Sequence, residues 1–141
     1  MIAEEFLQDL PEHMDIQVNA REYSPLVLAY VGDAVYEMFV RTKVVAQGNA
    51  AVNTLHKKAI AYVKAEAQAD VLRDMFAELS EKEQDIVKRG RNAKPFTVPK
   101  NADVMDYKYA TGLECLIGYL YLEKNFERLF EIMEKVIGKR V

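Results

Sequence analysis

Two acidic side chains stand out within the long apolar stretch Pro25–Val40. The stretch has the composition of a helix that is apolar nearly all round, and such a helix is normally buried. Its charged side chains are Asp33 and Glu37, which are four residues apart and so share one helical face. Two buried carboxylates lose their hydration and repel each other. The pattern therefore requires a compensating cation: an arginine, a lysine or a metal ion.

A second apolar stretch, Tyr109–Leu122, repeats the pattern with Glu114 as its one charged residue before the helix ends. Glycines accompany both sets of acids: Gly118 lies four residues beyond Glu114, and Gly32 adjoins Asp33. Glycine is costly inside a helix, so these positions suggest that two backbones, or a backbone and a ligand, approach closely. We expect the two helices to pack against each other as the core pair.

If they do, Asp33, Glu37 and Glu114 converge on one site. Three carboxylates without histidine form a hard, all-oxygen ligand set, which suits Mg²⁺ with Mn²⁺ as a substitute, and not zinc or copper. The alternative is structural: Glu37 and Glu114 each form an ion pair with a basic residue. The candidates for that pairing are Lys64, Lys108 and Arg41.

A basic segment without any acid runs from Val87 to Ala102. Its glycine and prolines predict a loop from Gly90 to Lys100. In an acidic chain this segment is the natural anion-binding patch, and the alternative is a solvated charge run. A further candidate is His56 with Lys57, although both residues could equally decorate a helix surface. The polar and basic candidates for contact with a nucleic-acid backbone are Lys88, Arg89, Arg91, Asn92, Lys94, Lys100, His56 and Lys57.

The composition is that of one ordinary globular domain. The chain has 141 residues, 50% of them hydrophobic and 29% charged, with a net charge of −3, so any polyanion site must be local. Its single cysteine, Cys115, excludes an internal disulfide and is expected to be a packed thiol. No apolar run is long enough for a membrane span, and the acidic N-terminus has no signal region. We therefore expect a single domain over 1–141, located in the cytoplasm.

Helical periodicity predicts an all-α helical bundle. We expect an amphipathic lead-in over residues 1–22, a helix from Pro25 to about Ala46, and helical structure from residues 50–53 to Leu79 with a break near Lys64. Further helices are predicted over residues 80–89, 101–123 and 126–137.

Five blocks of sequence resemble one known family, in the right order. Leu28–Glu37 resembles the signature helix of ribonuclease III, and Thr111–Gly118 resembles its second carboxylate helix. Leu55–Ala59, Lys88–Lys94 and Pro99–Val104 are similar to the compact branch, which is called Mini-ribonuclease III. This branch has only the catalytic domain and no double-stranded-RNA-binding domain.

The resemblance implies an all-α endonuclease domain that works as a homodimer, cuts double-stranded RNA and needs Mg²⁺. It also implies a role in maturing the 5′ and 3′ ends of the 23S ribosomal RNA precursor, with selectivity from RNA shape or from a large-subunit ribosomal protein partner. Asp33 and Glu114 match the family's catalytic, metal-binding acids, and Glu37 is a further metal-ligand candidate. The alternative is a catalytically inactive helical RNA-binding or assembly module.

Two positions depart from the longer ribonuclease III enzymes. Those enzymes have an acid where this chain has Ala29, and an Asp where this chain has Thr111. The number of metal ions per site is therefore left open: one Mg²⁺ that keeps more of its waters would suit the fewer carboxylates, and a two-metal arrangement cannot be carried over.

Overall fold

The computed structural model describes residues 10, 14, 17–94 and 103–138, and the regular elements among them are helices, with no strand. Most of the lead-in over residues 1–22 and most of the segment between Lys94 and Asp103 lie outside the described residues. The elements, in chain order, are η1 (Ala20–Glu22), α2 (Pro25–Ala46), α3 (Val52–Val63), α4 (Ala65–Met75), η2 (Phe76–Glu78), α5 (Glu81–Asn92), α6 (Val104–Leu122) and α7 (Phe126–Gly138). The all-α prediction is confirmed.

Local sequence accounts for where the helices begin. The Ser24 hydroxyl accepts a hydrogen bond from the Val27 N–H, directly before a proline at the first helical position of α2. Ser80 and Glu83 form a reciprocal capping box at the start of α5. The Asp103 carboxylate accepts from two backbone N–H groups of α6. In the predicted break, Lys64 has extended backbone (ψ 148°) and separates α3 from α4.

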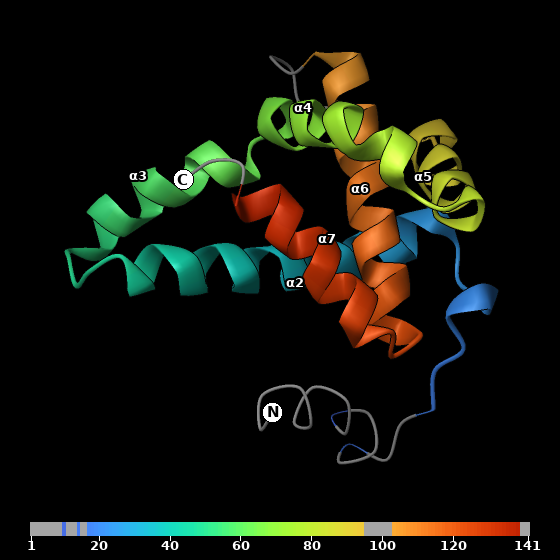
Figure 1. The fold of residues 1–141 in the computed structure, drawn as a ribbon, viewed down its shortest axis with the longest axis horizontal. Helices are drawn as coiled ribbons and strands as arrows, with labels where there is room; N and C mark the ends of the chain where they lie inside the picture. The colour runs from blue at the N-terminus through green and yellow to red at the C-terminus, as the bar shows by residue number, and fades with distance from the viewer. Residues whose placement is uncertain (1–9, 11–13, 15–16, 95–102, 139–141) are drawn as a thin grey trace.

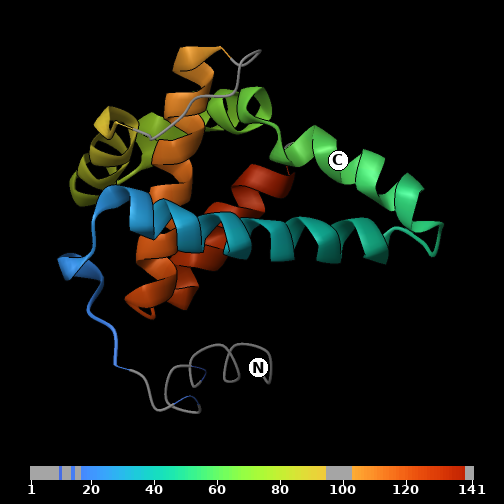
Figure 2. The same cartoon turned by 180° about the vertical axis from the view of Figure 1, so that it is seen from behind.

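Helix α6 is the central element. It packs against α2, α4 and α5, while α7 covers the junction of α2 and α6 (Figure 1). The C-terminal half of α2 extends away from α6 and carries α3 beside it, as the reverse view in Figure 2 also shows. The core between these elements contains Val40, Leu113, Leu116, Ile117, Leu129, Ile132 and Val136, all fully buried. No helix within the described residues is long and apolar enough to cross a membrane.

The predicted close approach of α2 and α6 is confirmed at Gly32 and Gly118. A Cβ atom on Gly32 would overlap the Glu114 carbonyl oxygen, and one on Gly118 would overlap the Leu28 carbonyl oxygen. The two backbones are therefore in direct contact, and they cross within one turn of both Asp33 and Glu114. Only glycine fits at these two positions.

A similar contact corrects the expected loop at Gly90. Helix α5 continues through Gly90 to Asn92, because Gly90 lies against α6. A Cβ on Gly90 would be 2.8 Å from Cys115 Cβ and 3.0 Å from Gly112 Cα. The glycine is thus needed for close helix packing and not for a turn.

The close contact at Gly32 predicts a large loss of stability for Gly32→Ala. The added methyl group would force α2 and α6 apart, so we expect the free energy of unfolding in urea to fall by about 3 kcal/mol or more. Gly138→Ala is the matched control, since nothing lies within 4 Å of a Cβ built there and its stability should not fall. Equal stability of the two variants would contradict the described crossing.

Candidate active site

The α2–α6 crossing brings Asp33 and Glu114 together. Their side chains are within hydrogen-bonding distance of each other, although they come from different helices. Asp33 is exposed, contrary to the expected buried face, whereas Glu114 is largely buried. The predicted pairing of these two acids is therefore present in the structure.

The pKa of Glu114 reflects this environment. Burial, together with the hydrogen bond and the negative charge of Asp33, raises it from an ordinary 4.5 to about 9, and Glu37 adds further repulsion. A hydrogen bond from the Gln68 side chain acts in the opposite direction. A divalent cation bound between two carboxylates would offset their mutual repulsion.

Glu37 does not complete a three-carboxylate site. Its Oε2 accepts a hydrogen bond from Arg41 Nε at 3.0 Å, one helical turn away, which is the ion pair that the structural alternative allowed for. Among the described residues, no three side chains of His, Cys, Asp or Glu gather closely enough to hold a metal ion. The expected convergence of three acids is therefore wrong for the described structure. Asp33 and Glu114 remain as the candidate ligands, and the other positions of a hard cation would be filled by water or substrate oxygens.

Thr111 occupies the helical turn before Glu114, where the longer enzymes have an acid. Its hydroxyl donates to the Tyr107 carbonyl at 2.9 Å and is thus engaged within its own helix. Cys115 is buried, which raises the pKa of its thiol to about 12, and so it is the packed, unreactive thiol that was expected.

Four of the expected RNA-binding residues lie at the end of α5, and two of them, Arg91 and Asn92, were expected in the loop after it. Lys88, Arg89 and Asn92 are exposed, and Arg91 is partly buried with its guanidinium 5.8 Å from the centre of the Tyr109 ring. Lys94 is exposed directly after the helix, and Lys100 lies outside the described residues. Together, Lys88, Arg89, Arg91 and Lys94 are called here the basic end of α5.

Two contacts fix α5 within the fold. The Gly90–Gly112 contact places α5 against α6 two residues before Glu114. Near the other end of α5, Arg128 of α7 forms a bidentate ion pair with Glu83, at 2.8 and 2.9 Å. The hydrogen bond from Arg128 lowers the pKa of Glu83, so this pair is ionised at neutral pH.

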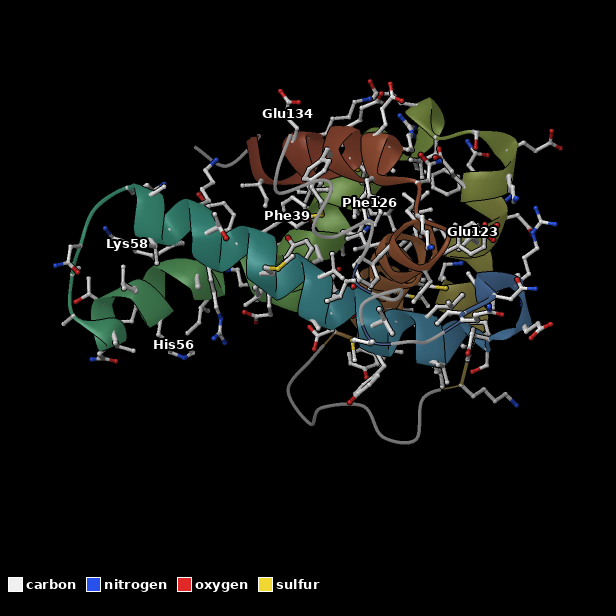
Figure 3. All side chains as sticks on the ribbon, turned by 90° about the horizontal axis from the view of Figure 1, so that it is seen from below. Phe39, His56, Lys58, Glu123, Phe126 and Glu134 are labelled. Atoms are coloured by element: carbon white, nitrogen blue, oxygen red, sulfur yellow. The ribbon has the colours of Figure 1, made fainter. Side chains whose placement is uncertain are left out.

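The other two RNA-binding candidates are on α3. His56 and Lys57 are both exposed, and Figure 3 shows His56 and Lys58 on the arm formed by α2 and α3, far from Glu123 at the end of α6. His56 also lines a cleft of about 340 Å³ together with Glu37 and Arg41. The cleft lies between α3 and the C-terminal half of α2, and its lining includes neither Asp33 nor Glu114.

Helix α2 also differs from the sequence prediction on its outer face. Val27, Tyr30 and Met38 are 44%, 82% and 42% exposed, so the helix is not buried all round within one chain. Together with Val45, which is 57% exposed, they follow helical spacing and form one stripe. This stripe is called the apolar row of α2, and it runs beside the exposed Asp33.

Sequence reasoning did not find Gln68. Its position could have been noticed, because Gln68 falls on the same helical stripe as Val71, Leu72 and Met75, which are all buried. A polar residue at a core position needs a hydrogen-bond partner, and here the partner is the Glu114 carboxylate.

Comparison with known proteins agrees with this fold and site. Residues 26–125 match the model of the Ribonuclease III domain, which defines the class: a nuclease domain acting on RNA. Mini-ribonuclease 3 of Thermoanaerobacter sp. (strain X514) is 58% identical over 111 residues, covering 79% of this chain and 78% of that protein. Mini-ribonuclease 3 of Clostridium tetani is 52% identical over 121 residues, which cover 85% of this chain and 80% of that protein.

A solved structure gives the same result. The crystal structure of protein FN1578 from Fusobacterium nucleatum is 37% identical, with a TM-score of 0.77 over 86% of this chain and 97% of that one. The chain therefore belongs to the Mini-ribonuclease 3 family, within the ribonuclease III class of endonucleases.

The raised pKa of Glu114 predicts how stability depends on pH in the presence of a chelator. Glu114 is protonated in the folded chain up to about pH 9 but ionises near pH 4.5 when unfolded. Between these values the folded state holds the extra proton, so stability falls as pH rises. We expect the melting temperature of the wild type to decrease from pH 5 to pH 9. In the Glu114→Gln variant the melting temperature should fall less steeply with pH, because the contribution of Glu114 is removed.

Glu127→Gln, at an exposed position on α7, is the matched control and should keep the slope of the wild type. Identical slopes for Glu114→Gln and the wild type would show that Glu114 ionises normally.

Proposed function

We propose that this chain is a Mg²⁺-dependent endoribonuclease that cleaves double-stranded RNA. The observation that carries the proposal is the contact between Asp33 and Glu114, in which two carboxyl groups from crossing helices face each other and the pKa of one is raised to about 9. Such a pair suits a hard divalent cation, which binds carboxylate oxygens and offsets their repulsion. Asp33 and Glu114 would hold this cation. Glu37 is a candidate for a third ligand only if its ion pair with Arg41 breaks.

The protein groups have separate tasks in this mechanism. Bound Mg²⁺ supplies a Lewis acid that lowers the pKa of water and stabilises charge on a phosphate oxygen. Asp33, which is exposed, is open to the substrate side, while Glu114 is held between the helices. The expected products of hydrolysis carry a 5′-phosphate and a 3′-hydroxyl.

The basic end of α5 would hold the RNA backbone. It is positive and mostly exposed, and close packing at Gly90 fixes it against α6, as suits a surface for a polyanion in an acidic chain. Double-stranded RNA is recognised mainly by shape through its phosphates and 2′-hydroxyl groups, and these residues are suited to such contacts. His56 and Lys57 on α3 are candidates for a more distant backbone contact.

The homodimer belongs to the same proposal. An exposed stripe of large apolar side chains beside a functional residue is typical of an interaction surface. Burying the apolar row of α2 against a second copy would place two sites on one assembly, so that the two strands of a duplex could both be cut. The resemblance to the compact branch supports the ends of the 23S ribosomal RNA precursor as the substrate, and a large-subunit ribosomal protein as a partner, both in the cytoplasm.

Cleavage assays test the central claim. Wild-type protein should cut a long RNA duplex with Mg²⁺ and fail with EDTA, whereas Asp33→Asn should lose activity by at least about a hundredfold because it removes a charged ligand. Circular dichroism should show that the variant is folded, and Glu127→Gln should cut like the wild type. Binding of duplex RNA without any cleavage would instead support the inactive assembly module.

The salt dependence of RNA binding tests the basic end of α5. Replacing Arg89 and Arg91 by Gln removes two phosphate contacts, so the slope of log K against log salt should become shallower by about 1 to 2. Filter binding with Asp33→Asn as the background avoids cleavage during the measurement. A slope that stays unchanged would remove these residues from the interface.

The apolar row of α2 is tested by Tyr30→Asp. A charge at this largely exposed position would be buried against a second copy, and we expect dimer formation to weaken by about 2 kcal/mol or more per subunit. Analytical ultracentrifugation should then show a monomer where the wild type is a dimer. Val104→Asp is the control and should remain dimeric, because Val104 is the exposed first residue of α6 and the start of α6 lies away from α2 (Figure 1).

A further inference from the structure

The ring of Tyr109 on α6 has two arginine guanidinium groups over it, one from each of two neighbouring helices. The Cζ atom of Arg73 on α4 lies 4.7 Å from the centre of the ring, and that of Arg91 on α5 lies 5.8 Å from it. A guanidinium at such a distance is attracted by the negative face of the ring. Two like charges repel each other, so sharing one ring is unfavourable unless at least one of them is balanced.

The charge of Arg73 is balanced by two acids. Its Nη2 donates to Asp106 at 3.0 Å, and its Nη1 donates to Asp70 at 3.3 Å. Asp106 is on α6, three residues before Tyr109, so this ion pair ties α4 to α6. Arg73 therefore has a structural role within the protein.

Arg91 has a different set of partners. Its Nε donates to the Asn92 side chain at 3.3 Å, which leaves both Nη groups. Within the described part of the chain, no acid forms an ion pair with Arg91. The planar fork of a guanidinium matches the oxygens of a phosphate. Of the two arginines on this ring, Arg91 is the one whose charge is left for an external anion.

The backbone of Arg91 is fixed as well. A Cβ built on Gly112 would be 3.5 Å from the Arg91 N atom and 2.8 Å from the Val87 carbonyl oxygen, so α5 and α6 are in close contact here. Gly112 follows Tyr109 by three residues, or about one helical turn. Helix α6, which also carries Glu114, thus holds Arg91 at two points: the backbone at Gly112 and the guanidinium at Tyr109.

We propose that Tyr109 is a positioning residue for RNA binding: the face of its ring holds the Arg91 guanidinium in the orientation that binds a phosphate of the RNA backbone. This inference rests on the proposed function in taking double-stranded RNA as the ligand. A long side chain loses conformational entropy when a ligand orders it, and a guanidinium that a ring already holds has less to lose. The role is indirect, because the ring acts on RNA through Arg91.

A double-mutant cycle tests this role. Binding of a short RNA duplex is measured in the Asp33→Asn background, which avoids cleavage. Tyr109→Leu removes the ring and keeps an apolar side chain, and we expect the affinity to fall about three- to fivefold. When Arg91→Gln is also present, Tyr109→Leu should cause no further loss, because the group that the ring holds is gone. Tyr109→Phe, which keeps the ring, should bind like the wild type.

Arg73→Gln is the matched control, since Arg73 lies over the same ring. Tyr109→Leu should weaken RNA binding by the same factor with and without Arg73→Gln. In cleavage assays with Asp33 intact, Tyr109→Leu should raise KM and leave kcat unchanged, because the ring is not part of the carboxylate pair.

A second variant serves if Tyr109→Leu does not fold. Pentafluorophenylalanine at position 109 keeps the shape of a phenyl ring and removes its negative face. It should bind RNA more weakly than Tyr109→Phe does. Equal affinity of these two proteins would contradict a role of the ring in holding a cation.

Equal losses from Tyr109→Leu with and without Arg91→Gln would overturn the inference, and so would wild-type affinity in the folded Tyr109→Leu variant. The proposed function fails separately: wild-type protein that binds the duplex and never cuts it would refute the nuclease, while the cycle would still decide the role of Tyr109. Wild-type protein that binds no duplex RNA would refute both.

Discussion

Direct contact between the backbones of α2 and α6 is the constraint on which the rest of the structure depends. Gly32 and Gly118 permit it, and it sets Asp33 against Glu114 with no side chain between the helices. The other helices are arranged around this crossing: α5 repeats the close approach at Gly90, and α4 brings an amide to the same carboxylate. A site that must hold two like charges together needs such rigid support.

Much of this arrangement could be predicted from the sequence because local patterns encode it. Isolated acids in apolar helices identified Asp33 and Glu114, and the glycines beside them identified the close approach. The caps at Ser24 and Ser80 identified where α2 and α5 begin. These features depend on residues that are near one another in the chain, or on rules that hold for any pair of packed helices.

The remaining features depend on tertiary geometry. The same glycine signal that was correct at Gly32 was misread as a turn at Gly90, because only the position of α6 distinguishes packing from chain reversal. Whether Glu37 joins a cluster or pairs with Arg41 depends on rotamers that the sequence does not specify. The periodicity of α2 likewise does not show whether its outer apolar face is covered by other helices of the same chain. In the structure this face is not covered, and Tyr30 is exposed to solvent.

The state of Glu114 also affects how a polyanion meets this surface. With its pKa near 9, Glu114 is neutral at physiological pH without a bound cation, so it adds no negative charge to the pair. An approaching phosphate then experiences less repulsion than a count of carboxylates suggests. The same proton must leave when a cation is held there, which makes occupancy of the site sensitive to acidity in a way that ordinary exposed acids are not.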